Sequence, residues 1–266
     1  MGLVYTLANQ KGGVGKTTTV INLGSYLAYY GKRVLLIDLD PQANATSSLG
    51  IDKSRIRGGT YEALSGSSNF TQYILHNPRF KISILPSSLA LAGAEVELVN
   101  ELARETRLKT AIQNLIERYD YILIDCPPSL GLLTLNGLVA AKDGVLIPVQ
   151  CEYLALEGLG QLTQTISRVQ SALYKDLIIR GVILTMFDTR TNLSNDVVEE
   201  VKQHFQEKVF NSIIPRSIRL AEAPSYGLPI SEYDPKSSGA QAYQSLAIEI
   251  LKSDGFAIPK STIGDG

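Results

Sequence analysis

Apolar residues recur along this chain in two distinct patterns. In the first, short runs are apolar at nearly every position, as at residues 34–37 and 122–124. In the second, apolar residues recur about every three or four positions over longer segments, as at residues 16–30. The first pattern is typical of strands in a parallel sheet that is covered on both faces, and the second of amphipathic helices. The sequence therefore predicts strands and helices that alternate along the chain.

Predicted strands occupy residues 3–8, 33–39, 82–86, 121–125, 145–150 and 178–184, with a short one near 209–213. Predicted helices occupy residues 16–30, 94–118, 132–141, 155–173, 195–206 and 239–251. This alternation predicts an α/β fold with a doubly wound, mostly parallel sheet and helices on both faces. In such a fold we expect function at the carboxyl ends of the strands.

Length and composition add few constraints. The 266 residues include 44% hydrophobic ones, an ordinary globular profile, and we expect a single domain over residues 1–252 with a loose tail at 253–266. Residues 58–77 are rich in small polar residues and glycine, which favours a surface excursion. The net charge of −1 means that any nucleic-acid binding must come from a local patch. Two cysteines provide no disulfide framework, and no segment is long and apolar enough to span a bilayer, so we expect a cytoplasmic protein.

The segment between the first predicted strand and the first predicted helix is a phosphate cradle. It reads Lys11-Gly12-Gly13-Val14-Gly15-Lys16-Thr17-Thr18. Its glycines let backbone N–H groups turn toward one anion, with the positive end of a helix behind them. Lys16 can reach the β- and γ-phosphates of a nucleotide, and the Thr17 hydroxyl can ligate Mg²⁺.

This cradle departs from the usual P-loop. The pattern G-x-x-x-x-G-K-[ST] requires glycine at position 10, where this chain has Gln10. The chain carries a second lysine instead, Lys11, and so has the deviant Walker A form. Lys11 has two interpretations. It is either a solvated charge on the loop or a residue that acts at the phosphates.

Two predicted strands end in acidic residues that suit a nucleotide site. Asp38 and Asp40 are two positions apart and so point to one face if the strand continues. We expect Asp40 to align the attacking water and Asp38 to support the metal. Asp125 follows four apolar residues, which is a Walker B pattern that holds Mg²⁺ directly or through water. Solvated acids that cap the next turn are the plain alternative for Asp38 and Asp40, and for Asp125 the alternative is that buried strands often end in aspartate.

Motifs spread over nearly the whole chain resemble one family. The stretches are residues 9–19, 34–44, 121–134, 148–158, 184–192 and 214–230. The last three are far more specific than a P-loop; for example, 148–158 reads P-V-Q-C-E-Y-L-A-L-E-G. Together they resemble the ParA/Soj family of chromosome- and plasmid-partitioning ATPases, within the deviant Walker A group that also includes MinD. The short, Soj-type members are the most similar.

The resemblance implies a function as well as a fold. It implies Mg²⁺-dependent ATP hydrolysis by a homodimer that sandwiches ATP, with Lys11 of each subunit reaching the partner's nucleotide. The residues it implies for catalysis are Lys11, Lys16 and Asp40, and those for the metal are Thr17, Asp38 and Asp125. The residues it implies for nucleotide binding are Lys11, Gly12, Gly13, Val14, Gly15, Lys16, Thr17, Thr18, Met186 and Pro215.

The resemblance also implies partners. The ATP-bound dimer would bind DNA without sequence preference and would be stimulated by a ParB-like centromere-binding protein, which implies a nucleoid-associated protein. Arg190 matches a DNA-contacting position of Soj-type proteins, and Arg216 and Arg219 are further candidates. Residues 161–236 hold nine basic and nine acidic residues, so no broad basic face is predicted.

Two other functions remain to be weighed. A ParA-like ATPase that positions another cargo would have the same cycle, and the sequence does not separate it from a partitioning protein. A MinD-like membrane-associated ATPase is less favoured, because it would end in a basic amphipathic helix. The end of this chain has Pro259 inside its only apolar patch, and we expect no membrane partner.

Overall fold

The computed structural model describes residues 1–153 and 155–258, which form seven strands in one sheet, with the order β3-β4-β2-β5-β1-β6-β7. The strands are β1 (Leu3–Leu7), β2 (Val34–Asp38), β3 (Leu75–Asn77), β4 (Ile82–Leu85), β5 (Tyr121–Asp125), β6 (Gly144–Gln150) and β7 (Ile179–Thr185). All neighbours pair in parallel except β3, which runs antiparallel to β4. The predicted fold class is confirmed.

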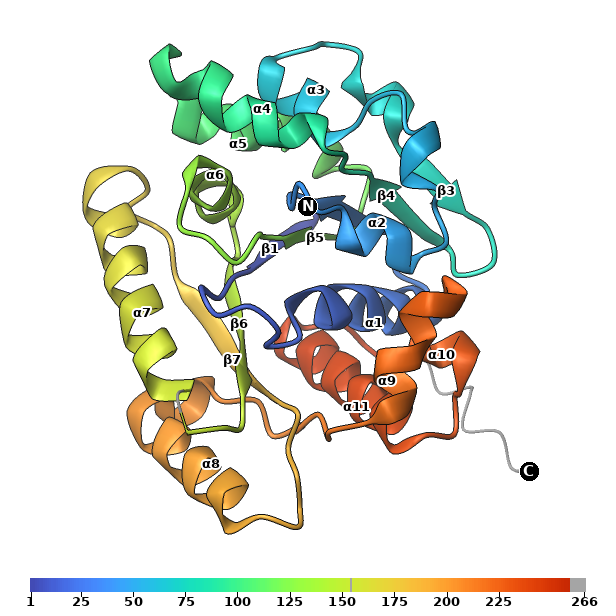
Figure 1. Cartoon of the computed structure of the whole chain (residues 1–266), viewed down its shortest axis with the longest axis vertical. Coiled ribbons are helices and arrows are strands. Elements are labelled where there is room, and N and C mark those ends of the chain that lie inside the picture. Colours follow the sequence, from blue (N-terminus) through green and yellow to red (C-terminus); the bar gives the residue numbers. More distant parts are fainter. Residues whose placement is uncertain (154, 259–266) are drawn as a thin grey trace.

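Helices cover both faces of this sheet (Figure 1). They are α1 (Lys16–Tyr29), α2 (Asn44–Ser48), α3 (Thr60–Ser65), α4 (Ala90–Glu97), α5 (Arg107–Ile112), α6 (Leu132–Ala140), α7 (Ala155–Ala172), α8 (Asn192–Phe205), α9 (Ile218–Glu222), α10 (Ile230–Tyr233) and α11 (Ser238–Ser253). Strand residues alternate between two cores, because successive side chains point to opposite faces. One core holds α1 and α11, and the other holds α3 to α8.

The central strands are completely buried. Every residue of β2, β4 and β5 is buried, which explains why these strands read as continuous apolar runs. The register places Asp38 at the end of β2 directly beside Asp125 at the end of β5. The fold therefore brings the two acidic strand ends together at the carboxyl edge of the sheet.

Two predictions of strand structure were wrong. Residues 209–213 form no strand, because only Val209 pairs with β7, through an isolated bridge to Val182. The N–H groups of Asn211 and Ser212 donate to Glu249 and so do not pair with β7. The short strand β3 was not predicted, because its three residues are at the edge of the sheet and are mostly exposed.

The predicted helix at 94–118 was also wrong. The segment instead forms α4, α5 and three short 3-10 turns, and the chain reverses at Ala103, which has a positive φ of 54°. Leu98 precedes this break and Leu108 follows it, and both side chains are buried in the same core. Two separate helical segments, one on each side of the break, therefore pack against the same core.

Residues 58–77 are more ordered than the predicted surface excursion. They contain α3, a 3-10 turn at Phe70–Tyr73 and β3. Thr60, Leu64 and Phe70 are buried, and the Thr60 hydroxyl donates to the backbone oxygen of Asp38 at 2.7 Å. This segment therefore supports the end of β2.

The start of the predicted loose tail is anchored in the structure. Asp254 accepts hydrogen bonds from the hydroxyls of Tyr5 (2.7 Å) and Tyr121 (2.8 Å) and from Arg180 (2.8 Å). Its side chain is 3% exposed. The remainder of the predicted tail, residues 259–266, lies outside the described residues, and the extent of the single domain stays a prediction.

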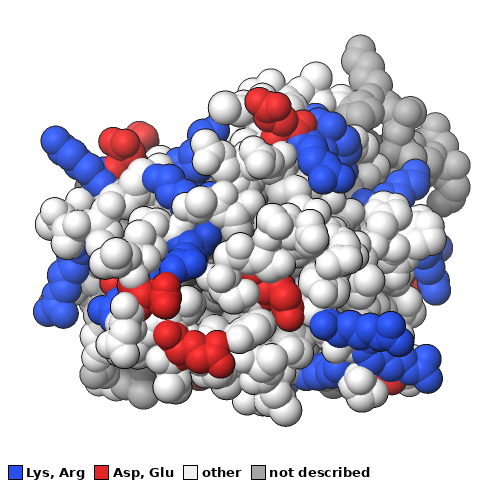
Figure 2. Space-filling view, turned by 90° about the horizontal axis from the view of Figure 1, so that it is seen from above, with Lys and Arg blue, Asp and Glu red and all other residues white. Residues whose placement is uncertain are grey.

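Charges of both signs are scattered over the end of the molecule that carries α3, α4 and α5 (Figure 2). Much of this face is uncharged, and no continuous basic surface is visible on it. None of the described helices is long and apolar enough to cross a membrane.

Candidate functional site

The loop between β1 and α1 has the geometry of an anion cradle. Gly13 and Gly15 have φ values of 74° and 86°, which side-chain-bearing residues rarely adopt. The ammonium of Lys16 is held at the mouth of the loop, where it donates to the backbone oxygens of Asn9 (2.9 Å) and Lys11 (3.2 Å). Lys16 is 7% exposed, and burial lowers its pKa against the opposing effect of Asp125. An anionic ligand would compensate the buried positive charge of the Lys16 ammonium.

The acidic edge of the site offers oxygen atoms to a cation. The Thr17 hydroxyl donates to one oxygen of Asp125 at 2.7 Å, and the other oxygen of Asp125 is buried without a partner among the described residues. Burial, followed by the charge of Asp38, raises the pKa of Asp125 well above its usual range. Oxygen ligands and closely spaced carboxylates suit Mg²⁺, so Thr17 and Asp125 fit this ion.

Mg²⁺ often keeps several waters and substrate phosphates as ligands. The described residues hold no group of three or more His, Cys, Asp or Glu side chains arranged around one metal position. A Mg²⁺ ion at this site would therefore take its ligands from Thr17, Asp125, water and the phosphates of a nucleotide.

Asp38 is committed to internal hydrogen bonds. One of its oxygens accepts from the backbone and hydroxyl of Thr46 at 2.8 and 2.7 Å, and the other accepts from the Asp40 backbone at 3.2 Å. Burial raises the pKa of Asp38 to about 6. These contacts hold α2 and the chain after β2 in place, which makes Asp38 a support for the site in this state.

Asp40 lies beside the cradle, as the sequence predicts. It lines a cavity of about 430 Å³ together with Gly12, Lys16, Thr17 and Pro128. One oxygen accepts from the Gln42 backbone at 2.9 Å. Asp40 is 6% exposed, and its carboxylate is therefore held in a fixed position near the phosphate space.

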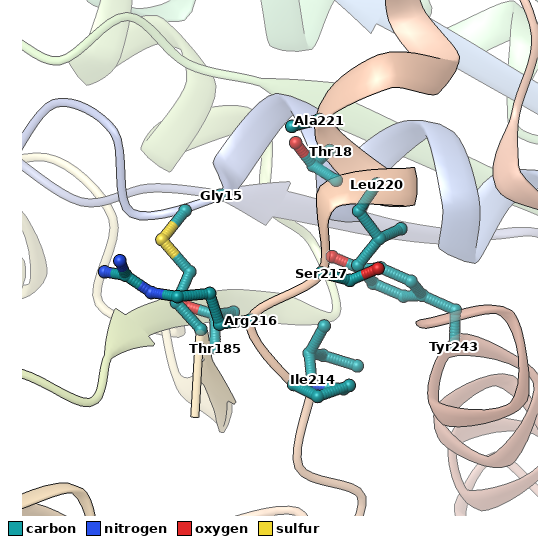
Figure 3. A pocket seen from close by; sticks show the side chains of 11 residues that line it. Gly15, Thr18, Thr185, Ile214, Arg216, Ser217, Leu220, Ala221 and Tyr243 are labelled. Carbon is teal, nitrogen blue, oxygen red and sulfur yellow. The ribbon is translucent and has the colours of Figure 1, made fainter. Parts of the chain in front are cut away.

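A second cavity, of about 360 Å³, continues from the first and is mostly apolar (Figure 3). Both cavities are lined by Gly15, Thr18 and Met186. Figure 3 shows side chains from β7, α9, α11 and the segment after Ile214 arranged around this space. The residues that line this second cavity but not the first are Thr185, Ile214, Pro215, Arg216, Ser217, Leu220, Ala221 and Tyr243. An apolar cavity next to a phosphate cradle suits a nucleotide base.

Two of the predicted nucleotide-binding residues, Met186 and Pro215, are both in this lining. Met186 has a φ of 52°, and the next residue, Phe187, forms an isolated bridge with Pro215. This bridge joins the end of β7 to the segment that closes the cavity. The strained backbone at Met186 is therefore part of the cavity wall.

Lys11 does not point into its own cradle. Its ammonium lies 4.0 Å from the carboxylate of Glu152, which follows β6. The other oxygen of Glu152 accepts a hydrogen bond from Arg216 at 2.9 Å. Glu152 thus links the deviant lysine of the P-loop with an arginine of the base cavity.

The three candidate DNA-binding arginines are exposed and ion-paired within the chain. Arg190 forms a two-point contact with Asp188 at 2.8 and 2.6 Å, and this pairing holds the pKa of Asp188 well below its usual range. Arg216 pairs with Glu152, whereas Arg219 on α9 pairs with Glu222 at 3.1 Å and Asp234 at 3.4 Å. The structure therefore does not gather them into one unopposed basic patch.

Several residues of the site could not be identified from the sequence. Asn44 and Ser48 of α2 line the phosphate cavity, and Leu220 and Tyr243 line the base cavity. Asn44 ends one of the motifs quoted above. Leu220 lies within another, residues 214–230, whereas Ser48 and Tyr243 are helix residues outside the quoted motifs that only the fold brings to the site.

Comparisons with known proteins agree with this geometry. Residues 3–179 match a protein family described as AAA domain. The chain is 54% identical to the sporulation initiation inhibitor protein Soj of Bacillus subtilis over 250 residues, which cover 94% of this chain and 98% of that one. It is 53% identical to the chromosome partitioning protein ParA of Myxococcus xanthus over 262 residues, with 98% and 91% covered.

A solved structure extends the likeness to the fold. The protein described as cobyrinic acid a,c-diamide synthase from Mycobacterium smegmatis, solved with bound ADP and magnesium, superposes with a TM-score of 0.83. It is 40% identical and covers 98% of this chain and 100% of its own. The predicted resemblance is thus confirmed over nearly the full length: the chain belongs to the Soj/ParA family of chromosome-partitioning ATPases.

Proposed function

We propose that this chain is a Mg²⁺-dependent ATPase that works as a slow molecular switch in DNA partitioning. ATP closes a dimer, the dimer binds DNA without sequence preference, and a ParB-like partner stimulates hydrolysis and release. One observation carries the proposal: Lys16, Thr17 and Asp40 line one cavity that continues into an apolar cavity beside Met186. Together the two cavities suit the phosphates and the base of one nucleotide.

Binding of ATP depends mainly on the cradle. The backbone N–H groups around Gly13 and Gly15 and the ammonium of Lys16 offset the charge of the phosphates. Thr17 and Asp125 would hold Mg²⁺, which supplies charge neutralisation at the β- and γ-phosphates when bound. The relative from Mycobacterium smegmatis, solved with ADP and magnesium, supports this assignment.

Hydrolysis depends on positioning. Asp40 is fixed near the phosphate space by its hydrogen bond from Gln42, and a carboxylate there can orient a water molecule for in-line attack. Lys16 stays beside the transferred phosphoryl group and stabilises the charge that develops there. Lys11 would add a second cation from the partner subunit, in the manner of an arginine finger.

Two features of the free chain support a switch. Lys11 is turned toward Glu152 instead of its own cradle, so it is free to act in a partner's site once that ion pair opens. Arg190 is 82% exposed, and its partner Asp188 is only two positions away in the same exposed loop, so a phosphate can compete for Arg190. Exposed ion pairs of this kind contribute little because solvent screens them, and they can be exchanged for DNA contacts.

Partitioning of chromosomes or plasmids is favoured over the other candidates. The relatives with identities of 54% and 53% carry partitioning or Soj names, whereas the cobyrinic acid protein is 40% identical. A ParA-like ATPase for another cargo would share the same site, and the adaptor protein would decide between them. A location at the nucleoid follows from the proposed DNA binding.

The proposal is tested by measuring DNA binding in each nucleotide state. Purified chain is titrated onto a labelled duplex of arbitrary sequence with ATP and Mg²⁺, with ADP and Mg²⁺, or without nucleotide. We expect binding at least tenfold tighter with ATP and equal for unrelated sequences. Equal binding in all three states would contradict the proposed switch.

A further inference from the structure

A cavity of about 490 Å³, which we call the amino-edge cavity, lies where three neighbouring parallel strands of the sheet begin. Its lining includes Arg33 just before β2, Lys81 just before β4, and Arg118 shortly before β5. Ala28, in the last turn of α1, also lines it. Because α1 begins at Lys16 in the phosphate cradle and spans about 20 Å, the amino-edge cavity is separate from the nucleotide site.

The charge in the lining of this cavity is of one sign. No aspartate or glutamate is among the described lining residues, and the cations are Lys32, Arg33, Lys81 and Arg118. Only Arg33 forms an ion pair within the described part of the chain, with Asp120 at 2.8 Å. Lys32 lies 3.7 Å from the centre of the Phe256 ring, a contact that leaves its charge uncompensated. In a chain of net charge −1, this local excess of positive charge favours an anionic ligand.

The backbone holds Lys81 at this cavity in an unfavourable conformation. Its φ of 55° is in the left-handed region, where glycine and asparagine are the usual residues. The turn that precedes it is fixed in place, because the Asn77 side chain accepts from the Arg79 backbone at 3.0 Å and the Phe80 side chain is buried. A lysine at such a position favours a role for its ammonium group.

A second cavity, of about 640 Å³, adjoins the amino-edge cavity, and Lys81 lines both. This neighbouring cavity adds another cation, Lys236, and the ring of Tyr29, which is 50% exposed. The one acid among its described lining residues, Glu232, is paired with Arg79 at 3.0 Å. The two cavities together have the size of a small-molecule site, and the aromatic ring offers an apolar surface beside the cations.

We propose that the amino-edge cavity binds a small molecule that carries two or more phosphate groups. Uncompensated cations from three segments match several negative charges, and lysine and arginine are the usual ligands of phosphate. The Ser83 hydroxyl, in a residue that is 7% exposed, adds a polar group to the lining, 3.2 Å from a ring nitrogen of His76. A concave site of this volume encloses a small molecule, whereas DNA is bound along its backbone over a wider surface. The proposal does not depend on the proposed ATPase switch.

Calorimetry with pyrophosphate as the probe tests this proposal. The full chain is first saturated with ADP and an equal amount of Mg²⁺, so that the phosphate cradle is filled and does not take up the probe. We expect one pyrophosphate to bind per chain, with an affinity that falls as the salt concentration rises. Inorganic phosphate should bind at least tenfold more weakly than pyrophosphate, because a single phosphate group reaches fewer of the cations.

Variants of the chain then locate the site. Lys81→Glu and Arg118→Glu should each weaken binding of pyrophosphate at least tenfold. Lys175→Glu and Arg168→Glu are matched controls, because they change the net charge equally at exposed cations that line neither cavity, and they should change the affinity less than twofold. Lys81→Asn removes the charge but places a residue that tolerates the left-handed conformation, so it should weaken binding at least fivefold without lowering the temperature of thermal unfolding.

Three results would overturn the proposal. The first is the same loss of pyrophosphate binding in Lys81→Glu and Lys175→Glu, which would be a general effect of net charge. The second is tighter binding of citrate than of pyrophosphate, which would assign the cavity to carboxylates. The third is a Lys81→Glu variant that loses binding to duplex DNA and binds pyrophosphate normally, because its cation would then serve DNA and not a small molecule.

Discussion

The ammonium of Lys11 lies 4.0 Å from the carboxylate of Glu152, outside the phosphate cradle to which Lys11 belongs in sequence. The cradle's own cation is Lys16, which is bonded to the backbone oxygens of Asn9 and Lys11. The two lysines of the motif are therefore separated in space. This separation allows their roles to be tested independently.

We expect Lys11→Ala to bind ATP nearly as well as the unaltered chain and yet to fail to form an ATP-dependent dimer. The reason is that Lys11 contributes no charge to its own cradle and would act in the partner's site. Light scattering with ATP and Mg²⁺ measures the mass, and calorimetry measures ATP affinity. Lys142→Ala is the matched control, because Lys142 also lies 4.0 Å from a carboxylate, that of Asp143. A normal dimer formed by Lys11→Ala would make Lys11 a bystander.

Lys16→Ala should lose ATP binding by at least about a hundredfold, which is about 2.7 kcal/mol. Lys16 is the buried cation of the cradle, and its removal also frees two backbone oxygens that it now satisfies. Isothermal calorimetry with ATP and Mg²⁺ gives the affinity, and Lys11→Ala provides the comparison. An unchanged affinity in Lys16→Ala would remove the P-loop assignment.

Arg190→Glu should weaken binding to every DNA tested and leave ATP-dependent dimerisation unchanged. Reversal of the charge removes an attraction to phosphate and adds a repulsion, so we expect at least a tenfold loss per dimer and a smaller salt dependence. Binding is measured with ATP at several salt concentrations. Arg55→Glu is a control, since Arg55 is also exposed and paired with a nearby acid, Asp52. The same loss in both variants would show a general charge effect in place of a contact at Arg190.

Asp254 should contribute strongly to stability although it is near the end of the described chain. Asp254→Ala leaves Arg180 and the hydroxyls of Tyr5 and Tyr121 without their acceptor, which we expect to cost about 3–5 kcal/mol. Urea unfolding measures this change, with Asp196→Ala on the exposed side of α8 as the control. A change below about 1 kcal/mol would mean that the anchor is unimportant.

The same cluster makes stability sensitive to alkaline pH. Burial, with Asp254 adding to it, raises the pKa of Tyr5 and Tyr121 above the ordinary value near 10. The folded chain therefore keeps these protons where the unfolded chain releases them. The free energy of unfolding should fall as pH rises above about 10, and this fall should be smaller in a Tyr5→Phe variant.

The sequence predicted the parts of the site that come directly after a recognisable strand. The cradle, Asp40 and Asp125 follow strands whose apolar runs are unmistakable, so their placement at one edge of the sheet could be inferred. Tyr243 could not be assigned in this way, because only the folded chain brings α11 to the base cavity. The role of Glu152 was missed because its contacts with Lys11 and Arg216 join segments that are far apart in sequence. The break at Ala103 was missed because residues 94–118 contain no glycine or proline, and Ala103 adopts its positive φ without a residue type that would signal it.

The central claim is that ATP controls association of two chains, and Asp40→Ala tests it most directly. Removal of the carboxylate that aligns water should stop turnover without loss of ATP binding, because the contact matters in the transition state. Light scattering of this variant with ATP and Mg²⁺ should give twice the mass of the chain, and the mass of one chain with ADP. A single-chain mass under both conditions, at ATP concentrations that calorimetry shows to be saturating, would contradict the account.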